Sequence, residues 1–161
     1  MLTTITLEPD GELRRWTAAM LMDEWRGTVA RRGELVDPGG LEGMVALRDH
    51  TPVGAVTYLI FGRAWEIVAL NAIERRRGVG RVLVDAVLER ARHAGADSVW
   101  LITTNDNLDA IAFYESVGFE LVTCHSGAVD DARATLKPSI PTHAANGLPI
   151  RDELEFRLRL G

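Results

Sequence analysis

A basic, glycine-containing turn between an apolar strand and an amphipathic helix is the feature that most limits how this chain can fold. The turn is Arg75-Arg76-Arg77-Gly78-Val79-Gly80-Arg81. The preceding run, 65–72, is apolar and strand-like, and the apolar positions after the turn recur at helical spacing. Glycines at the turn let the backbone bend tightly and approach a ligand closely. The sequence therefore predicts a strand, a tight turn and a helix in succession, an α/β arrangement.

The start of this predicted helix is suited to an anion. The amides of a helix's first turn have no partner within the helix, and the helix dipole favours negative charge there. Arg75, Arg77 and Arg81 add positive charge, so a pyrophosphate fits. The turn is not a Rossmann fingerprint, because Leu83 stands where the third glycine is required, and it lacks the Gly-Lys-Ser/Thr of a P-loop. For the arginines alone, a solvated basic turn remains the alternative interpretation.

Hydrophobic periodicity predicts the other elements of a mixed α/β fold. Strands are expected over 3–7, 44–48, 53–61, 65–72, 98–103, 119–124 and 154–160, and helices over 12–25, from 79 to Gly95, over 107–117 and around 128–136. Residues 26–42 remain ambiguous. We expect a single domain over 1–161, with an insertion at about 125–152 between the last two strands. A connection of this length in a compact domain is usually functional or disordered.

Composition excludes several classes of function. The chain of 161 residues is 47% hydrophobic and carries a net charge of −5, which disfavours binding to nucleic-acid backbones. No apolar run is long enough to span a membrane, and no secretory signal is visible, so a cytoplasmic protein is expected. The single cysteine, Cys124, is expected to be buried and unpaired. The histidines and Cys124 have no metal-ligand spacing, so no metal is expected.

A second motif follows the predicted strand 98–103. It is Asn107-Leu108-Asp109-Ala110-Ile111-Ala112-Phe113-Tyr114-Glu115-Ser116-Val117-Gly118-Phe119. Together with Arg75-x-x-Gly78-x-Gly80, this segment resembles the two motifs of the GNAT N-acetyltransferase superfamily. The resemblance covers 53–123 in motif detail and the whole chain in topology. It implies an α/β (α+β) fold with a mixed, mostly antiparallel sheet of about seven strands. About four helices would flank this sheet, which would splay at its central parallel strands.

The resemblance also implies acetyl-CoA as acyl donor. Its pyrophosphate would be held by the amides around the basic turn, namely Arg75, Arg76, Arg77, Gly78, Val79, Gly80 and Arg81. The pantetheine arm would pair with the strand end Leu70, Asn71 and Ala72, and would contact Asn107. One departure is that only Ile73 and Glu74 separate Ala72 from Arg75, whereas many relatives have a longer loop with proline there.

Two residues are predicted to carry catalysis by direct transfer without a covalent intermediate. Tyr114, which the resemblance places at the thioester sulfur, would protonate the departing thiolate. The alternative is an ordinary packed aromatic residue. Glu66 would take the proton of the attacking amine, because a carboxylate among apolar neighbours is a suitable base and many family members keep a glutamate near this point. The alternative is an outward-facing strand residue in solvent. A backbone amide near Leu70 would polarise the thioester carbonyl.

The acceptor is expected to be a primary amine of a small molecule. Thr104, Asn105 and His125 are candidate contacts, although Asn105 and Asn107 also suit a helix cap and His125 suits a loop. The insertion is expected to flank the acceptor as a substrate-selecting wall, or to form a dimer element in a possible homodimer. Two other functions remain open: a non-catalytic acyl-CoA-binding sensor or interaction module, and an acetyltransferase acting on proteins.

Overall fold

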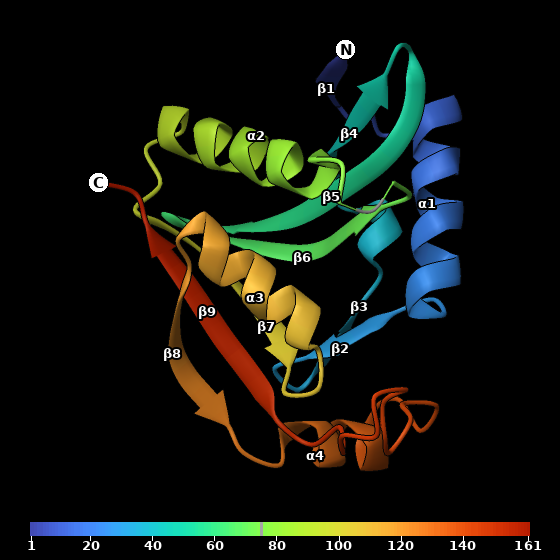
Figure 1. The fold of residues 1–161 in the computed structure, drawn as a ribbon, viewed down its shortest axis with the longest axis vertical. Helices are drawn as coiled ribbons and strands as arrows, with labels where there is room; N and C mark the ends of the chain where they lie inside the picture. The colour runs from blue at the N-terminus through green and yellow to red at the C-terminus, as the bar shows by residue number, and fades with distance from the viewer. Residues whose placement is uncertain (75) are drawn as a thin grey trace. The chain divides into compact units, whose positions relative to one another are not determined.

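The protein has the mixed α/β fold expected from the sequence, and its described residues form a mostly antiparallel main sheet of seven strands and four α-helices (Figure 1). A computed structural model describes residues 1–74 and 76–161. The strands are β1 Leu2–Thr6, β2 Val29–Arg31, β3 Glu34–Val36, β4 Glu42–Arg48, β5 Thr51–Phe61, β6 Ala64–Ala72, β7 Ser98–Thr104, β8 Glu120–His125 and β9 Glu153–Arg159. The helices are α1 Glu12–Trp25, α2 Val79–His93, α3 Leu108–Val117 and α4 Ala128–Thr135, with a 3-10 turn at Pro38–Gly40.

Contacts divide the chain into two compact units. The first contains residues 1–28, 37–99 and 159–161, and the second contains residues 29–36 and 100–158. The single domain and the splayed central strands expected from the sequence stay predictions. None of the helices described in either unit is long and apolar enough to cross a membrane.

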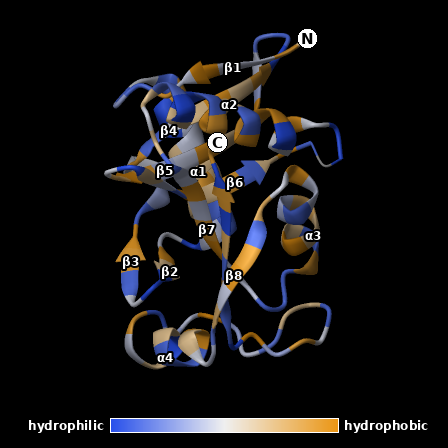
Figure 2. Cartoon of the chain, turned by 90° about the vertical axis from the view of Figure 1, so that its left-hand side faces the viewer, coloured by the Kyte–Doolittle hydropathy of each residue, from blue (hydrophilic) through white to orange (hydrophobic). Residues whose placement is uncertain are grey.

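The first unit is an antiparallel meander covered by two helices. Strands β1, β4, β5 and β6 lie in this order, and Met44 in β4 pairs with Thr6 on one side and Val56 on the other. Helix α1 packs its apolar face on this sheet. Leu13, Trp16 and Met20 of α1 contact a buried cluster of Leu7, Val45 and Ala55. Helix α2 is amphipathic and carries both hydrophobic and hydrophilic residues (Figure 2). Its buried face includes Leu83 and Val87.

The second unit contains β8 and most of β7 and β9, together with a small hairpin that the sequence left ambiguous. The hairpin pairs Val29–Arg31 with Glu34–Val36 in antiparallel register. Strand β8 pairs only with β9 in the described sheet and forms its edge, so its residues 120–124 are exposed on both faces. The prediction that Cys124 is buried was therefore wrong, since an edge strand without a covering layer leaves both faces in solvent.

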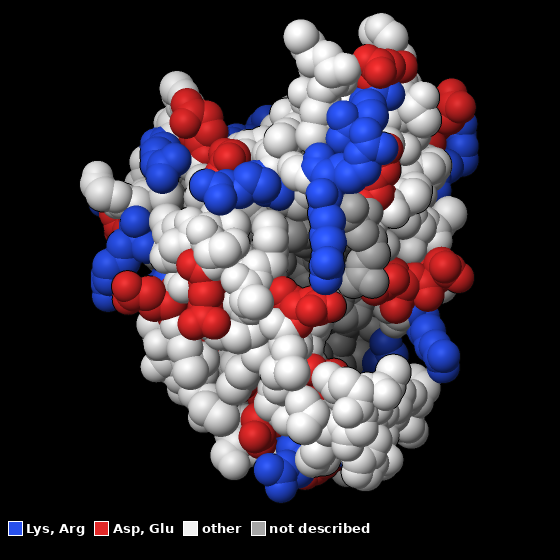
Figure 3. Space-filling view, viewed as in Figure 1, with Lys and Arg blue, Asp and Glu red and all other residues white. Residues whose placement is uncertain are grey.

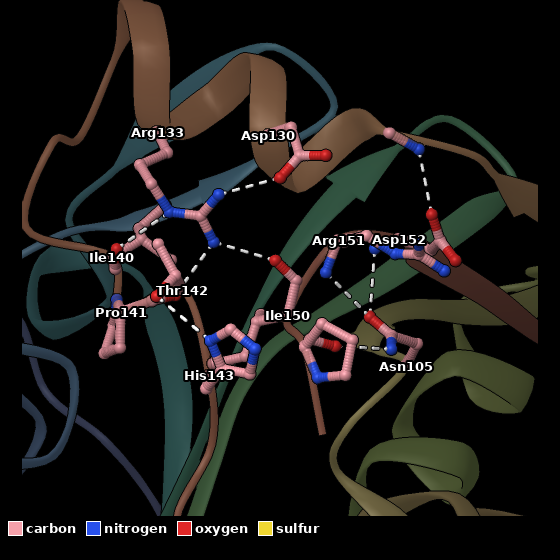
Figure 4. A network of polar contacts seen from close by, with 12 residues as sticks. Asn105, Asp130, Arg133, Ile140, Pro141, Thr142, His143, Ile150, Arg151 and Asp152 are labelled. Atoms are coloured by element: carbon pink, nitrogen blue, oxygen red, sulfur yellow. Dashed lines mark hydrogen bonds and ion pairs between the residues drawn. The ribbon is translucent and has the colours of Figure 1, made fainter. Parts of the chain in front are cut away.

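The insertion between β8 and β9 is held by two polar side chains (Figure 4). Arg133 of α4 donates hydrogen bonds to the carbonyls of Ile140, Pro141 and Ile150 at 2.7–2.9 Å, and pairs with Asp130 at 2.8 Å. The amide side chain of Asn105 donates to the Pro149 carbonyl at 2.8 Å. Its oxygen accepts from the backbone amides of residues 151 and 152 at 2.9 and 3.0 Å. These hydrogen bonds hold the insertion in one conformation within the second unit.

Candidate active site

Strand β6 carries the candidate base and a break in its pairing with β5. Thr57 pairs with Ala69 and Tyr58 pairs with Ile67, so Val68 is an extra residue that forms a bulge. Glu66 lies two residues before Val68 and is only 1% exposed. The alternative of a solvent-facing Glu66 is therefore wrong. Glu66 has at least one polar or electrostatic interaction in this buried part of β6, next to the bulge.

The end of β6 leads directly to the start of α2. Leu70, Asn71 and Ala72 are half-buried and pair with residues 56, 55 and 54 of β5. Helix α2 begins after Gly78, which has φ 81° and makes no side-chain cap. Val82 is the first residue whose amide bonds back to Gly78, at 3.0 Å, so the amides of Val79, Gly80 and Arg81 have no partner within the helix. This confirms the predicted start of α2. It also leaves three backbone amides that point outward from the N-terminal end of the helix.

Gly54 in β5 is the residue that lets α2 start so close to the sheet. A Cβ atom at this position would lie 2.6 Å from Cγ1 of Val79 and 2.9 Å from the carbonyl oxygen of Asn71. Real Cβ atoms do not approach so closely, and one of the two clashing atoms belongs to the backbone. Gly54 therefore fixes the distance between β6 and the first turn of α2.

Basic side chains surround the turn before α2. Figure 3 shows basic side chains gathered on the upper part of the face in view, where α2 begins. Arg48 pairs with Glu74 at 2.7 Å and donates to the Arg77 carbonyl at 3.3 Å. Arg77 also lies 3.6 Å from Glu74, and Arg81 lies 3.5 Å from Asp85. Arg76 is exposed, with a positive φ of 57°. Arg75 lies outside the described residues.

Helix α3 places the candidate acid in an apolar setting. Asn107 caps the helix, because its side-chain oxygen accepts from the Ala110 amide at 3.2 Å. Tyr114 is 8% exposed and packs edge-on against Phe113 and Phe119, with ring centroids 5.1 and 5.6 Å apart. Burial raises the pKa of the Tyr114 phenol above its usual value near 10. The phenol is therefore protonated at neutral pH and holds a proton that it could donate.

The three candidate acceptor contacts have different surroundings within the second unit. The carbonyl of Thr104, at the end of β7, accepts from the Asn107 amide at 3.1 Å. The Asn105 side chain is engaged by three backbone groups of the insertion. His125 ends β8, contacts Glu155 at 3.2 Å and lines a pocket of about 360 Å³. Among the three, the structure associates only His125 with this pocket.

Sequence reasoning missed several residues that build these sites. Gly54 had no local motif, and its role appears only when α2 packs on β5. Glu74 and Arg48 are far apart in the sequence, so their ion pair was not predicted. The position of Glu74 directly before three arginines is the one local signal that this carboxylate pairs with a cation. Arg32 and Glu153, which line the pocket with His125, are separated by most of the chain. No group of three or more metal-ligating side chains occurs among residues 1–74 and 76–161.

Comparisons with known proteins identify the family of this chain. Residues 6–119 match the family model described as the acetyltransferase (GNAT) family. The chain is 42% identical over 117 residues to the uncharacterized protein YdhI of Bacillus subtilis, covering 72% of both proteins. It is 32% identical to the ribosomal protein bS18-alanine N-acetyltransferase of Salmonella typhimurium, over 47% of this chain and 51% of that one. It is 28% identical to the streptothricin acetyltransferase of Streptomyces lavendulae, over 71% of this chain and 64% of that one.

Solved structures show the same fold. An acetyltransferase of Bacillus subtilis, crystallised in complex with CoA, superposes with a TM-score of 0.73 over 100% of both chains at 19% sequence identity. At that identity the likeness shows the fold alone, and the sequence match shows the family. The chain is therefore a member of the GNAT acetyltransferase family, which makes it an acyltransferase with acetyl-CoA as its co-substrate.

Proposed function

We propose that this protein transfers the acetyl group of acetyl-CoA to a primary amine of a small molecule by direct attack. The observation that carries the proposal is the start of α2, where the three amides that follow the N-cap residue Gly78 have no partner within the helix and lie beside a cluster of arginines. Such a helix start binds a pyrophosphate through hydrogen bonds and through the helix dipole. Leu70, Asn71 and Ala72 lie directly before it and would align the pantetheine arm. Asn107 would contact that arm through groups not used in capping α3.

Glu66 and Tyr114 are the proposed acid–base groups. The amine must lose a proton before or during attack, and the buried Glu66 carboxylate would accept it. The departing sulfur must gain a proton, and the Tyr114 phenol holds one at neutral pH, since the usual pKa of a phenol is near 10 and burial raises the pKa of Tyr114 further. The residue that bulges from β6, Val68, frees local backbone groups from the ladder, so that an amide in this region would polarise the thioester carbonyl.

An acceptor of small size is supported by the pocket in the second unit, whose volume of about 360 Å³ lies within the usual range of small-molecule sites. His125 lines this pocket, and Thr104 and Asn105 remain proposed neighbours of the acceptor. A protein acceptor is the second candidate, because one relative acts on an alanine of ribosomal protein bS18. A non-catalytic acyl-CoA module would retain donor binding without turnover.

Two experiments test the proposal. Acetyl-CoA in large excess should raise the melting temperature by about 5–10 °C, whereas NAD should not. Release of the CoA thiol with a panel of small amines and with N-terminal peptides then separates the two acceptor classes. Tyr114→Phe should lower kcat by about 100-fold or more while acetyl-CoA still binds. No thermal shift with acetyl-CoA would contradict the proposed donor site, and donor binding without turnover on any amine would contradict catalysis.

A further inference from the structure

The pocket in the second unit is lined by segments that are distant in sequence. Its wall consists of Arg32 and Gly33 from the β2–β3 turn, His125 and Glu153 from the paired ends of β8 and β9, and one side of α4. Residues from α4 are Ala128, Asp131, Ala132 and Thr135, and the C-cap residue Leu136 follows them in the wall. The α4 side is fixed by Arg133, which bonds to three carbonyls of the returning chain. The pocket is therefore pre-formed.

Glu153 is the unusual group in this wall, because it is a carboxylate that is only 3% exposed. Its Oε1 accepts one hydrogen bond, from the backbone amide of Arg32 at 3.0 Å. Among residues 1–74 and 76–161, Glu153 makes no ion pair, and its Oε2 has no hydrogen-bond partner. Burying a carboxylate is costly unless a cation or several donors compensate it. A buried carboxylate at a pocket wall with one oxygen unused is thus chemically suited to a ligand cation.

The other charged groups of the wall do not neutralise Glu153. The Arg32 guanidinium lies over the Trp100 ring, 5.1 Å from its centroid, and only the backbone of Arg32 reaches Glu153. His125 contacts Glu155, which also pairs with Arg157 at 3.5 Å. Asp131 adds a second carboxylate to the pocket wall. The formal charge of the lining is therefore negative with His125 neutral.

We propose that this pocket binds a cationic group of a small amine, with the Glu153 carboxylate as its anchor and Asp131 as a second anion. One part of this inference rests on the proposed function, namely that the bound cation is the non-reacting end of the amine acceptor. The acceptor is then an amine that carries a second ammonium group. Glu153 selects such molecules over amines of equal length that lack the second charge or carry a carboxylate in its place.

Three probes of matched length test the selection: 1,4-diaminobutane, butylamine and 4-aminobutanoate. Calorimetric titration of the full chain, without acetyl-CoA, should give a Kd for 1,4-diaminobutane about tenfold lower than that for butylamine, as expected for one charge-assisted contact. Glu153→Gln keeps an oxygen for the Arg32 amide and removes only the charge, and should abolish this difference. Glu120→Gln, which removes an exposed carboxylate of β8, should leave the difference intact.

Each remaining outcome decides the proposal. Equal Kd values for 1,4-diaminobutane and butylamine in the wild type, or tighter binding of 4-aminobutanoate, would overturn it without any variant. If Glu153→Gln does not fold, Thr135→Trp, which fills the pocket from an exposed position on α4, should remove binding of 1,4-diaminobutane. Retained binding would overturn the location. The acetyl-CoA thermal shift is measured separately, so a failed donor site and a failed cation pocket are distinguishable.

Discussion

The start of α2 and the Glu153 pocket are opposite in charge and in construction. The start of α2 offers backbone amides, an uncapped glycine and a group of arginines, and suits an anion. The Glu153 pocket offers buried and exposed carboxylates on side chains from β9 and α4, and suits a cation. The first is made by consecutive residues, whereas the second is assembled from segments more than a hundred residues apart.

This difference explains what kind of ligand selectivity each region can have. A helix start with free amides recognises a pyrophosphate through main-chain geometry, which any sequence with the same glycines reproduces. The pocket depends on which side chains happen to meet, so it can change from one relative to another without loss of the fold. We therefore expect the donor site to be the common property of the fold and the Glu153 pocket to be a specific property of this chain.

The largest effect is expected from replacing a buried carboxylate, and Glu66 and Glu153 should differ in what their replacement changes. Glu66→Gln should lower kcat by about 100-fold with every amine tested, because general-base catalysis typically contributes at least that factor. Glu153→Gln should instead lower the ratio of kcat/KM for 1,4-diaminobutane to that for butylamine. Both are measured by release of the CoA thiol. A Glu66→Gln enzyme with unchanged kcat would remove Glu66 from the mechanism.

A change at Gly54 tests the construction of the donor site. Gly54→Ala should lower the free energy of unfolding by about 2–3 kcal/mol, because the added Cβ would overlap Val79 and the Asn71 carbonyl, of which only the side chain can move. It should also weaken acetyl-CoA binding, since α2 must shift away from β5. Gly40→Ala is the control, because a Cβ there meets only Asp37 at 3.7 Å. Equal stability of the two variants in urea denaturation would contradict the close-packing argument.

The contrast also shows how far the sequence alone could reach. Helix α1 has the predicted bounds, Glu12–Trp25, because its apolar spacing is regular, and α2 begins at the predicted glycine turn. The β2–β3 hairpin was not predicted, since its strands have three residues each and carry charged side chains. The prediction that Cys124 is buried was wrong, because the alternation of residues in a sequence does not reveal that β8 is an uncovered edge strand. The basic turn was readable as a local motif, whereas Arg32 and Glu153 meet only in the folded chain.

Asn105 allows the insertion to be destabilised without changing any charged side chain of the pocket. Asn105→Ala should lower the free energy of unfolding by about 1–2 kcal/mol, because two backbone amides and one carbonyl of the insertion lose their partner. Binding of 1,4-diaminobutane should weaken with it. The more exposed Asn146, which bonds to the Asp106 carbonyl at 3.0 Å, is the control, and Asn146→Ala should cost less. A higher KM for Asn105→Ala at unchanged stability would instead make Asn105 an acceptor contact.

The smallest effect concerns Tyr114 at high pH. Burial raises the pKa of the Tyr114 phenol, so the folded chain keeps this proton at a pH where the unfolded chain, with a pKa near 10, releases it. Below about pH 10 both states hold the proton and the contribution is constant, whereas above it the free energy of unfolding falls. At about pH 11 the loss is about 1.4 kcal/mol for a phenol that stays protonated.

Tyr114→Phe should therefore show a shallower fall in stability than the wild type between about pH 8 and about pH 11 in urea denaturation. Burial also raises the pKa of Tyr58, which stacks on Trp65, so part of the fall should remain in Tyr114→Phe. Tyr58→Phe is accordingly the matched comparison. Identical pH profiles for the wild type and Tyr114→Phe would mean that the pKa of the phenol is the same in the folded and unfolded chains, which would contradict the burial of Tyr114.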